Sequence, residues 1–137
     1  MTNGPNFDQL LETARQAALR AYAPYSKFRV GAAALDDAGR VFVGCNVENA
    51  SLGLSLCAER SALAAAVAGG AGRLTALALW FPDLPEPGPA LSEGASTPCG
   101  ACRQWLVELA PEASLVTSHS PEPIPIRELL PKAFSLG

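Results

Sequence analysis

Two apolar runs separated by a short turn set the type of fold that this chain can adopt. Residues 28–35 are apolar and rich in glycine and alanine, and residues 40–47 contain three valines and a phenylalanine, a composition typical of strands. Residues 36–39, Asp-Asp-Ala-Gly, lie between the runs and favour a tight hairpin turn. The sequence therefore predicts a sheet that begins with an antiparallel hairpin.

Helix-like and strand-like runs follow one another along the rest of the chain. A helix is predicted over residues 7–22, where Asn6 is placed to cap it and apolar residues recur every three to four positions. Further runs predict helices over 57–67 and 99–109, strands over 74–81 and 113–118, and a turn of helix over 126–130. This order predicts an α/β layered fold in one domain, residues 1–137. The proline-rich residues 82–98 are predicted to form a surface loop.

Composition and charge argue against several classes of partner. The chain is 49% hydrophobic and has a formal net charge of −3. Because long nucleic acids are held through basic stripes, this balance disfavours DNA or RNA and favours a small uncharged ligand. The polar N-terminus lacks a signal-peptide pattern and residues 62–68 are too few to span a membrane, so we expect a cytoplasmic protein without membrane contact. Its four cysteines are then expected to be ligands or core thiols rather than disulfides.

Three cysteines lie at the predicted starts of two helices. Cys99 and Cys102 form a C-x-x-C motif after Pro98, and Cys57 begins the sequence Cys-Ala-Glu. Free N–H groups and the helix dipole stabilise thiolates at such positions. The only histidine, His119, is interpreted as a strand-end residue rather than a ligand. A zinc site in this chain is therefore predicted to be built from sulfur.

The fourth cysteine leaves two kinds of zinc site open. A site that includes Cys45 would be closed and structural, whereas the other three cysteines alone would leave a position for water, as catalytic sites do. Cys45 lies within a strand-like run and is interpreted as a core thiol. Glu59, two residues after Cys57, favours the open site, because a carboxylate on the first helical turn can reach water at the metal.

Longer segments around the cysteines carry a family resemblance. The segments are Cys57-Ala58-Glu59-Arg60 and Pro98-Cys99-Gly100-Ala101-Cys102-Arg103-Gln104, with further similarity over residues 25–33, 46–51 and 129–134. Together they resemble the small, homotetrameric cytidine deaminases, which share the signature of zinc deaminases. The resemblance covers nearly the whole chain. It implies a three-layer α/β/α sandwich with a mixed central sheet of about five strands.

The resemblance implies a role for each matching residue of the two cysteine motifs. Cys57, Cys99 and Cys102 would bind Zn²⁺, one ion per subunit. Glu59 would take a proton from the attacking water and deliver it to the pyrimidine ring, and Arg60 would donate to the ligand sulfurs. The implied reaction is the deamination of free cytidine and deoxycytidine in pyrimidine salvage, by a homotetramer.

Five further residues are implied to hold the nucleoside: Phe28, Asn46, Glu48, Ala58 and Phe134. The ring of Phe28 would wall the pyrimidine, and the backbone around Ala58 would hold the edge of the base. Asn46 and Glu48 would hold a ribose hydroxyl, and the carboxylate would repel a 5′-phosphate, which favours nucleosides over nucleotides. Phe134 would close the pocket from the C-terminus or from a neighbouring subunit.

Two features depart from the family pattern. Leu52 stands where the family commonly has a tyrosine that touches the sugar across a subunit interface, and the loop at residues 82–98 is longer. They motivate an alternative, a deaminase of the same fold that acts on another aminopyrimidine or on a nucleoside antibiotic. A structural zinc module of four cysteines and a nucleic-acid editor are further alternatives.

Overall fold

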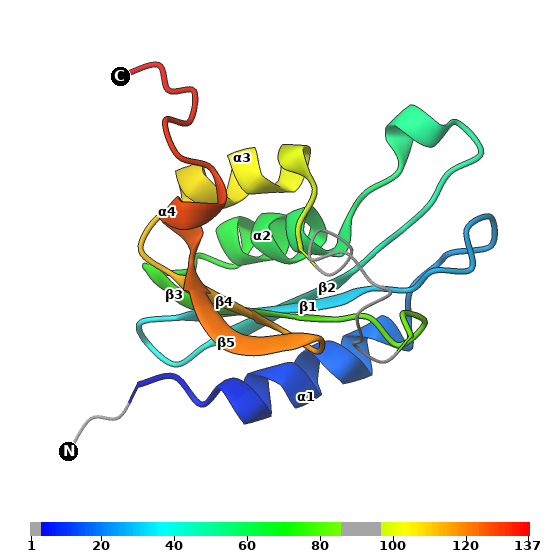
Figure 1. The fold of residues 1–137 in the computed structure, drawn as a ribbon, viewed down its shortest axis with the longest axis horizontal. Coiled ribbons are helices and arrows are strands. Elements are labelled where there is room, and N and C mark those ends of the chain that lie inside the picture. Colours follow the sequence, from blue (N-terminus) through cyan, green and yellow to red (C-terminus); the bar gives the residue numbers. More distant parts are fainter. Residues whose placement is uncertain (1–3, 86–96) are drawn as a thin grey trace.

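A five-stranded sheet lies between two layers of helices in the computed structural model, which describes residues 4–85 and 97–137 (Figure 1). Helix α1 (Phe7–Ala18) covers one face, and α2 (Ala58–Ala68), α3 (Gly100–Leu109) and α4 (Ile126–Leu129) cover the other. This arrangement confirms the three-layer α/β/α sandwich. Most of the predicted loop at residues 82–98 lies outside the described residues. Within those residues, every helix is too short or too polar to cross a bilayer.

The sheet is mixed, with the strand order β2-β1-β3-β4-β5. Its strands are β1 (Gly31–Asp36), β2 (Val41–Cys45), β3 (Leu74–Trp80), β4 (Ser114–Thr117) and β5 (Ser120–Pro125). Strands β3 and β4 are parallel, and the other neighbours are antiparallel. The predicted hairpin is present, with Gly31 opposite Cys45 and Leu35 opposite Val41.

Two boundaries differ from the sequence-based expectation. The sequence predicts no strand over residues 120–125, because Pro123 and Pro125 have no N–H group to donate within a sheet. The segment nevertheless forms β5, which is an edge strand among the described strands and pairs with β4, and prolines are tolerated on such strands. Helix α1 ends at Ala18 rather than at residue 22, because the backbone of Tyr22 bonds with Asn46 O at 3.0 Å.

Successive residues of the strands face opposite helical layers, as the pleat of a sheet requires. The face toward α1 carries mostly alanines, and the face toward α2 and α3 carries larger leucines. Buried strand residues on the α1 face are Ala33, Ala76, Ala78 and Val116, and those on the other face include Ala34, Leu77, Leu79 and Leu115. The larger apolar cluster therefore lies on the side where the cysteine-bearing helices pack.

Gly44 of β2 lets the backbone of α2 lie directly on the sheet. A β-carbon at this position would lie 2.3 Å from Ala62 N and 2.8 Å from Ala58 O, closer than such atoms can approach. Ala58 is the first residue of α2, so this contact sets the height of the helix start above the sheet. Gly44 thereby positions the turn that carries Cys57 and Glu59.

We expect Gly44→Ala to lower the free energy of unfolding by about 1–3 kcal/mol, because the added methyl group meets helix backbone that cannot rotate away. Gly4→Ala is the matched control, since a β-carbon at Gly4 has no neighbour within 4 Å. That control should change stability by no more than about 0.5 kcal/mol. Denaturant unfolding measures both values, and equal stability of the two variants would contradict the close packing.

Candidate metal and substrate site

Three cysteine side chains converge where the N-termini of α2 and α3 meet. Cys57 is the N-cap residue of α2, Cys99 is the N-cap residue of α3, and Cys102 lies in the first turn of α3. Their Sγ atoms all lie within 4.8 Å of one another, and Cys102 is fully buried. The two helix dipoles point their positive ends at these atoms and stabilise negative charge on sulfur. The fold thus brings together the three cysteines that are predicted from the sequence to be zinc ligands.

The donor set fits a thiophilic divalent metal such as zinc. Zinc binds thiolates at about 2.3 Å, so two sulfurs on one tetrahedral ion are about 3.8 Å apart, within the spacing observed between these thiols. Cys45 lies in β2, and in the described parts of the chain the one group of potential metal ligands contains only the other three cysteines. This composition leaves a coordination position without a protein ligand and disfavours the closed four-cysteine site.

Arg60 and a hydrogen bond between two of the thiols determine which cysteine sulfur carries the negative charge. Arg60 Nη2 lies 3.5 Å from Cys57 Sγ and also 3.5 Å from Ser55 O, to which it donates. A hydrogen bond from the Cys102 thiol, helped by Arg60 and opposed by burial, lowers the pKa of Cys57 to about 5. The interaction with Cys57, together with burial, raises the pKa of Cys102 above its ordinary range. Cys57 is therefore the thiolate at neutral pH, and Arg60 balances its charge.

Glu59 is a buried carboxyl group on the first turn of α2. Only 6% of its surface is exposed, and it follows the Cys57 thiolate by two residues. Burial raises the pKa of Glu59 to about 7, and the negative charge of Cys57 adds to this effect. A group with such a pKa can hold or release a proton near neutral pH, as a general acid or base must.

The Asn46 side chain holds the backbone that leads into β1. Its Oδ1 accepts a hydrogen bond from Val30 N at 2.7 Å, and its Nδ2 donates to Phe28 O at 2.8 Å. These bonds occupy Val30 N and Phe28 O, two backbone groups that strand pairing would otherwise use, and the strand predicted at residues 28–35 begins only at Gly31. A primary amide has two donor hydrogens, and within residues 4–85 and 97–137 Asn46 Nδ2 has the single acceptor Phe28 O, so its second hydrogen can serve a ligand.

Glu48 holds the turn that precedes Phe28. Its Oε1 accepts hydrogen bonds from Tyr25 N at 3.0 Å and Ser26 N at 3.1 Å, and its Oε2 accepts one from the Ser26 hydroxyl. The bonds from Ser26 lower the pKa of Glu48, so this carboxylate is ionised at neutral pH. Both residues predicted to bind ribose therefore also fix the segment that presents Phe28.

The ring of Phe28 packs against the same apolar cluster that contains Ala58. Phe28 is half-buried, whereas Ala58 and Phe81 are buried members of the cluster. The rings of Phe28 and Phe81 are tilted by 32° with centroids 6.2 Å apart. Phe28, the predicted wall of the base, and Ala58, the predicted backbone contact, thus lie in one apolar cluster. This cluster is on the side of the sheet where the helices with the thiols pack.

Arg103 braces the start of α3, a role that the sequence patterns did not predict. Its Nε donates to Pro98 O at 2.8 Å, directly before Cys99, and its Nη1 donates to Leu129 O in α4 at 2.7 Å. The third donor, Nη2, lies 3.0 Å from Thr97 Oγ1. Proximity to the C-x-x-C motif was the available signal, but the partner at Leu129 is 26 residues away.

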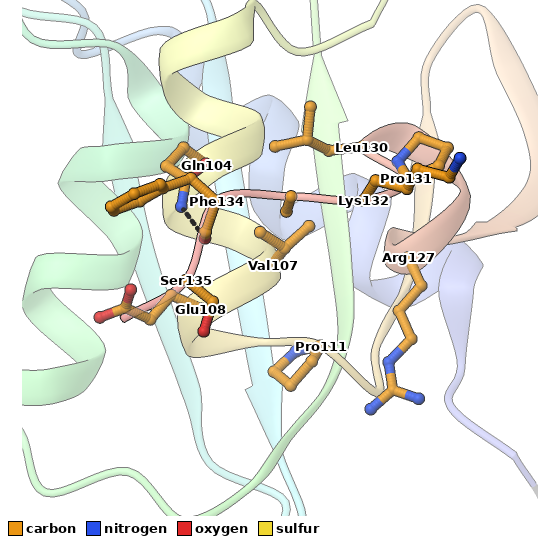
Figure 2. A pocket seen from close by; sticks show the side chains of 11 residues that line it. Gln104, Val107, Glu108, Pro111, Arg127, Leu130, Pro131, Lys132, Phe134 and Ser135 are labelled. Carbon is orange, nitrogen blue, oxygen red and sulfur yellow. Dashed lines mark hydrogen bonds between the residues drawn. The ribbon is translucent and has the colours of Figure 1, made fainter. Parts of the chain in front are cut away.

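Phe134 lies beside α3 at a hollow of about 400 Å³ between that helix and the C-terminal segment (Figure 2). Gln104 Nε2 donates to Phe134 O at 3.1 Å, which ties the segment to α3. Phe134 and Gln104 line the hollow, but the cysteines, Glu59 and Phe28 do not. With 72% of its surface exposed, Phe134 is free to meet another chain. Its predicted part in closing the pocket stays a prediction.

Comparison with known proteins gives relatives that share both sequence and length. The family described as "Cytidine and deoxycytidylate deaminase zinc-binding region" matches residues 6–118. A cytidine deaminase of Mycobacterium tuberculosis is 47% identical over 131 residues, which cover 96% of this chain and 91% of that relative. A cytidine deaminase of Halalkalibacterium halodurans is 43% identical over 130 residues, covering 92% of each chain.

Solved structures agree with this likeness. The crystal structure of the cytidine deaminase from Mycobacterium tuberculosis superposes with a TM-score of 0.80 at 44% identity, covering 96% of this chain and 99% of the other. That of the cytidine deaminase from Burkholderia pseudomallei gives 0.78 at 41% identity, covering 98% and 100%. The similarity therefore extends over the whole fold, including both cysteine-bearing helices.

Substitution of single cysteines tests the composition of the metal site. We expect Cys45→Ser to retain the metal content of the unsubstituted chain, because Cys45 lies outside the thiol group. Cys102→Ser should lose most of the bound metal, because a buried ligand is replaced by a poor donor for a thiophilic ion. Elemental analysis after gel filtration measures both. Loss of metal from Cys45→Ser would restore the closed four-cysteine site.

Proposed function

This chain belongs to the cytidine deaminase family, and from that premise we propose that it hydrolyses free cytidine and deoxycytidine to uridine and deoxyuridine with release of ammonia. It is a cytidine deaminase enzyme, as relatives at 43–47% identity over at least 92% of the chain indicate. The observation that carries the proposal is the meeting of three thiols and one buried carboxyl group at two helix N-termini. A structural zinc module would leave the buried carboxyl group beside the thiols without a purpose. A nucleic-acid editor would not need the acidic net charge of this chain.

Cys57, Cys99 and Cys102 would hold the zinc ion in this proposal. Bound zinc supplies a Lewis acid that makes water a better nucleophile at neutral pH. Three thiolates alone would leave excess negative charge at such a site, and Arg60 offsets it through the contact with Cys57 Sγ. The helix N-termini add to the same balance, since the positive ends of both dipoles face the sulfurs.

Glu59 carries the protons of the proposed reaction. The carboxylate takes a proton from the attacking water and gives it to the ring nitrogen next to C4, while the water oxygen bonds to C4. The second proton of that water then passes to the amino group through Glu59, and the bond from C4 to nitrogen breaks with loss of ammonia. Burial beside Cys57 keeps bulk water from competing for these protons.

Asn46, Glu48 and Phe28 bind the nucleoside in this proposal. The free Nδ2 hydrogen of Asn46 and the carboxylate of Glu48 suit the donor and acceptor character of a sugar hydroxyl. The ionised Glu48 also repels a phosphate on the sugar, which favours nucleosides over nucleotides. Phe28 supplies an apolar face for the pyrimidine, and its backbone is held by Asn46.

We propose a homotetramer because apolar residues are exposed on parts that project from the body. Leu52 and Leu54 lie in a single turn of 3-10 helix, η1 (Leu52–Leu54), and are 75% and 72% exposed. Figure 1 shows that this turn and the C-terminal segment extend away from the sheet. Burial of such side chains against further copies would lower their free energy. A role in pyrimidine salvage follows from the proposed reaction, and the cytoplasmic location and single-domain organisation stay predictions.

Leu52 supports the alternative that this deaminase accepts substrates other than cytidine and deoxycytidine. The exposed leucine cannot donate the hydrogen bond that the family's tyrosine makes, so the sugar side of the pocket can differ from that of the relatives. A deaminase of this fold with a relaxed sugar side could act on another aminopyrimidine or on a nucleoside antibiotic. A substrate panel therefore belongs to the test of function.

The first test measures zinc per chain and the loss of cytidine absorbance, with and without a strong chelator. We expect about one zinc per chain and turnover that stops when the metal is removed. The panel contains cytidine, deoxycytidine, cytosine and an aminopyrimidine nucleoside antibiotic. Zinc binding without turnover of either nucleoside would reject the proposed substrates and favour the alternative range.

Glu59→Gln tests the proton carrier. We expect it to keep zinc and fold but to lose about 10²–10⁴-fold in turnover, because an amide cannot exchange protons with water and substrate. Glu12→Gln is the matched control, since Glu12 is an exposed residue of α1 paired with Arg15. Near-normal activity of Glu59→Gln, measured with the zinc content verified, would remove Glu59 from the mechanism.

Sedimentation equilibrium at micromolar concentration tests the assembly. We expect the mass of four chains for the unsubstituted protein. Leu52→Ser together with Leu54→Ser should shift the equilibrium toward smaller species, because about 0.8 kcal/mol is lost for each methylene group that is no longer buried. A monomer at that concentration in the unsubstituted protein would contradict the homotetramer.

A further inference from the structure

His119 has contacts that the proposed reaction does not use. The residue follows β4, and its Nε2 lies 3.2 Å from Leu84 O and 2.8 Å from Pro85 O. Both partners are carbonyl oxygens, which only accept, so Nε2 carries a hydrogen and donates to them. His119 thereby holds the chain shortly after the end of β3, at a sequence distance of about 35 residues.

Ser118 extends this hold to Phe81. The Ser118 Oγ lies 2.9 Å from His119 Nδ1, and it accepts a hydrogen bond from Phe81 N at 3.1 Å. In the tautomer that carries the ring proton at Nε2, Nδ1 accepts the hydrogen of the Ser118 hydroxyl. Three backbone groups of residues 81–85 are therefore bound by the adjacent side chains of Ser118 and His119.

Ring contacts connect His119 to the substrate side. The rings of His119 and Phe81 form a T-shaped pair, with centroids 6.2 Å apart and an angle of 68° between the ring planes. Phe81 is 6% exposed, and it contacts the half-buried ring of Phe28. Because Phe81 has no free space to rotate in the core, its position limits where the Phe28 ring can lie. A displacement of Phe81 is thus transmitted to the proposed wall of the pyrimidine.

A second contact holds the same segment from the side of Phe28. Asp83 Oδ2 accepts hydrogen bonds from Arg29 N at 2.8 Å and Arg29 Nε at 3.0 Å, and Asp83 Oδ1 accepts one from Arg29 Nη2 at 2.8 Å. Arg29 directly follows Phe28, so the segment after β3 and the segment before β1 are fixed to each other. His119 binds the residues that follow Asp83, through Leu84 O and Pro85 O.

We propose that His119, with Ser118, is a positioning residue for the pyrimidine pocket: it fixes Phe81 and thereby the ring of Phe28. The inference rests on the proposed function, in which Phe28 contacts the base. The contacts of His119 with the described residues include neither the three thiols nor Glu59. A misplaced Phe28 ring would therefore weaken binding of the ground state and of the transition state equally. Such a loss raises KM and leaves kcat unchanged.

The test compares His119→Phe with His119→Gln in the zinc-loaded protein. Phenylalanine keeps a ring against Phe81 but removes the hydrogen bonds to Leu84 O and Pro85 O and the contact with the Ser118 hydroxyl. KM for cytidine should therefore rise about fivefold while kcat stays within about twofold. Glutamine places an amide donor near the Nε2 position and should restore KM to within about twofold of the unsubstituted value. Amide hydrogen exchange at Phe81 and Leu84 should rise in His119→Phe and not in His119→Gln.

Ser118→Ala gives an independent test should His119→Phe fail to fold. It removes the acceptor of Phe81 N, so both KM and the rate of amide hydrogen exchange at Phe81 should rise, as in His119→Phe. Ser114→Ala, the same change at the first residue of β4, is the matched control and should alter neither. Faster exchange with an unchanged KM, or a fall in kcat as large as the rise in KM, would overturn the role.

The unsubstituted chain separates failure of this inference from failure of the proposed function. If the zinc-loaded wild type neither binds nor converts cytidine or deoxycytidine, the proposed function is wrong, and the role of His119 falls with it. If the wild type converts cytidine and both His119→Phe and Ser118→Ala keep its KM, only the role of His119 is overturned.

Discussion

The contact between α2 and β2 is the packing interaction on which the site depends. Gly44 admits the helix backbone, and the start of that helix carries Cys57 and Glu59. Thiols bind one metal ion together only when their sulfurs lie within a few ångströms, so a small displacement of α2 separates Cys57 from the cysteines of α3. The chemistry of the site therefore depends on the absence of a side chain at a buried position beneath the backbone of α2.

Local patterns were enough to predict most of the fold. Asn6 caps α1 through Gln9 N at 3.0 Å, and the hairpin between β1 and β2 follows its turn residues. The patterns failed where long-range pairing overrides local preference. Strand β5 forms despite its prolines because its pairing with β4 is at the sheet edge. Likewise, α1 ends early because Tyr22 finds a partner 24 residues away, at Asn46 O.

The metal ligands could be identified from sequence because each lies at a helix start, where spacing and chemistry coincide. The supporting contacts could not, since they join segments far apart in the chain. Asn46 binds Phe28 and Val30, Arg103 reaches Leu129, and His119 reaches Leu84. A histidine at the end of a strand is usually without a special role, and only the fold shows that two carbonyl oxygens face its ring.

The prolines of β5 have a consequence for how the protein behaves at high concentration. Ile126 N faces β4 and donates to Ala113 O, so the preceding residue, Pro125, turns its nitrogen to the open edge of the sheet. A proline nitrogen has no hydrogen, and Pro123 removes another donor from the strand. A foreign strand approaching this edge would find fewer donors to pair with, and the charged Glu122 lies between the prolines of β5. Both features protect the sheet from edge-to-edge aggregation.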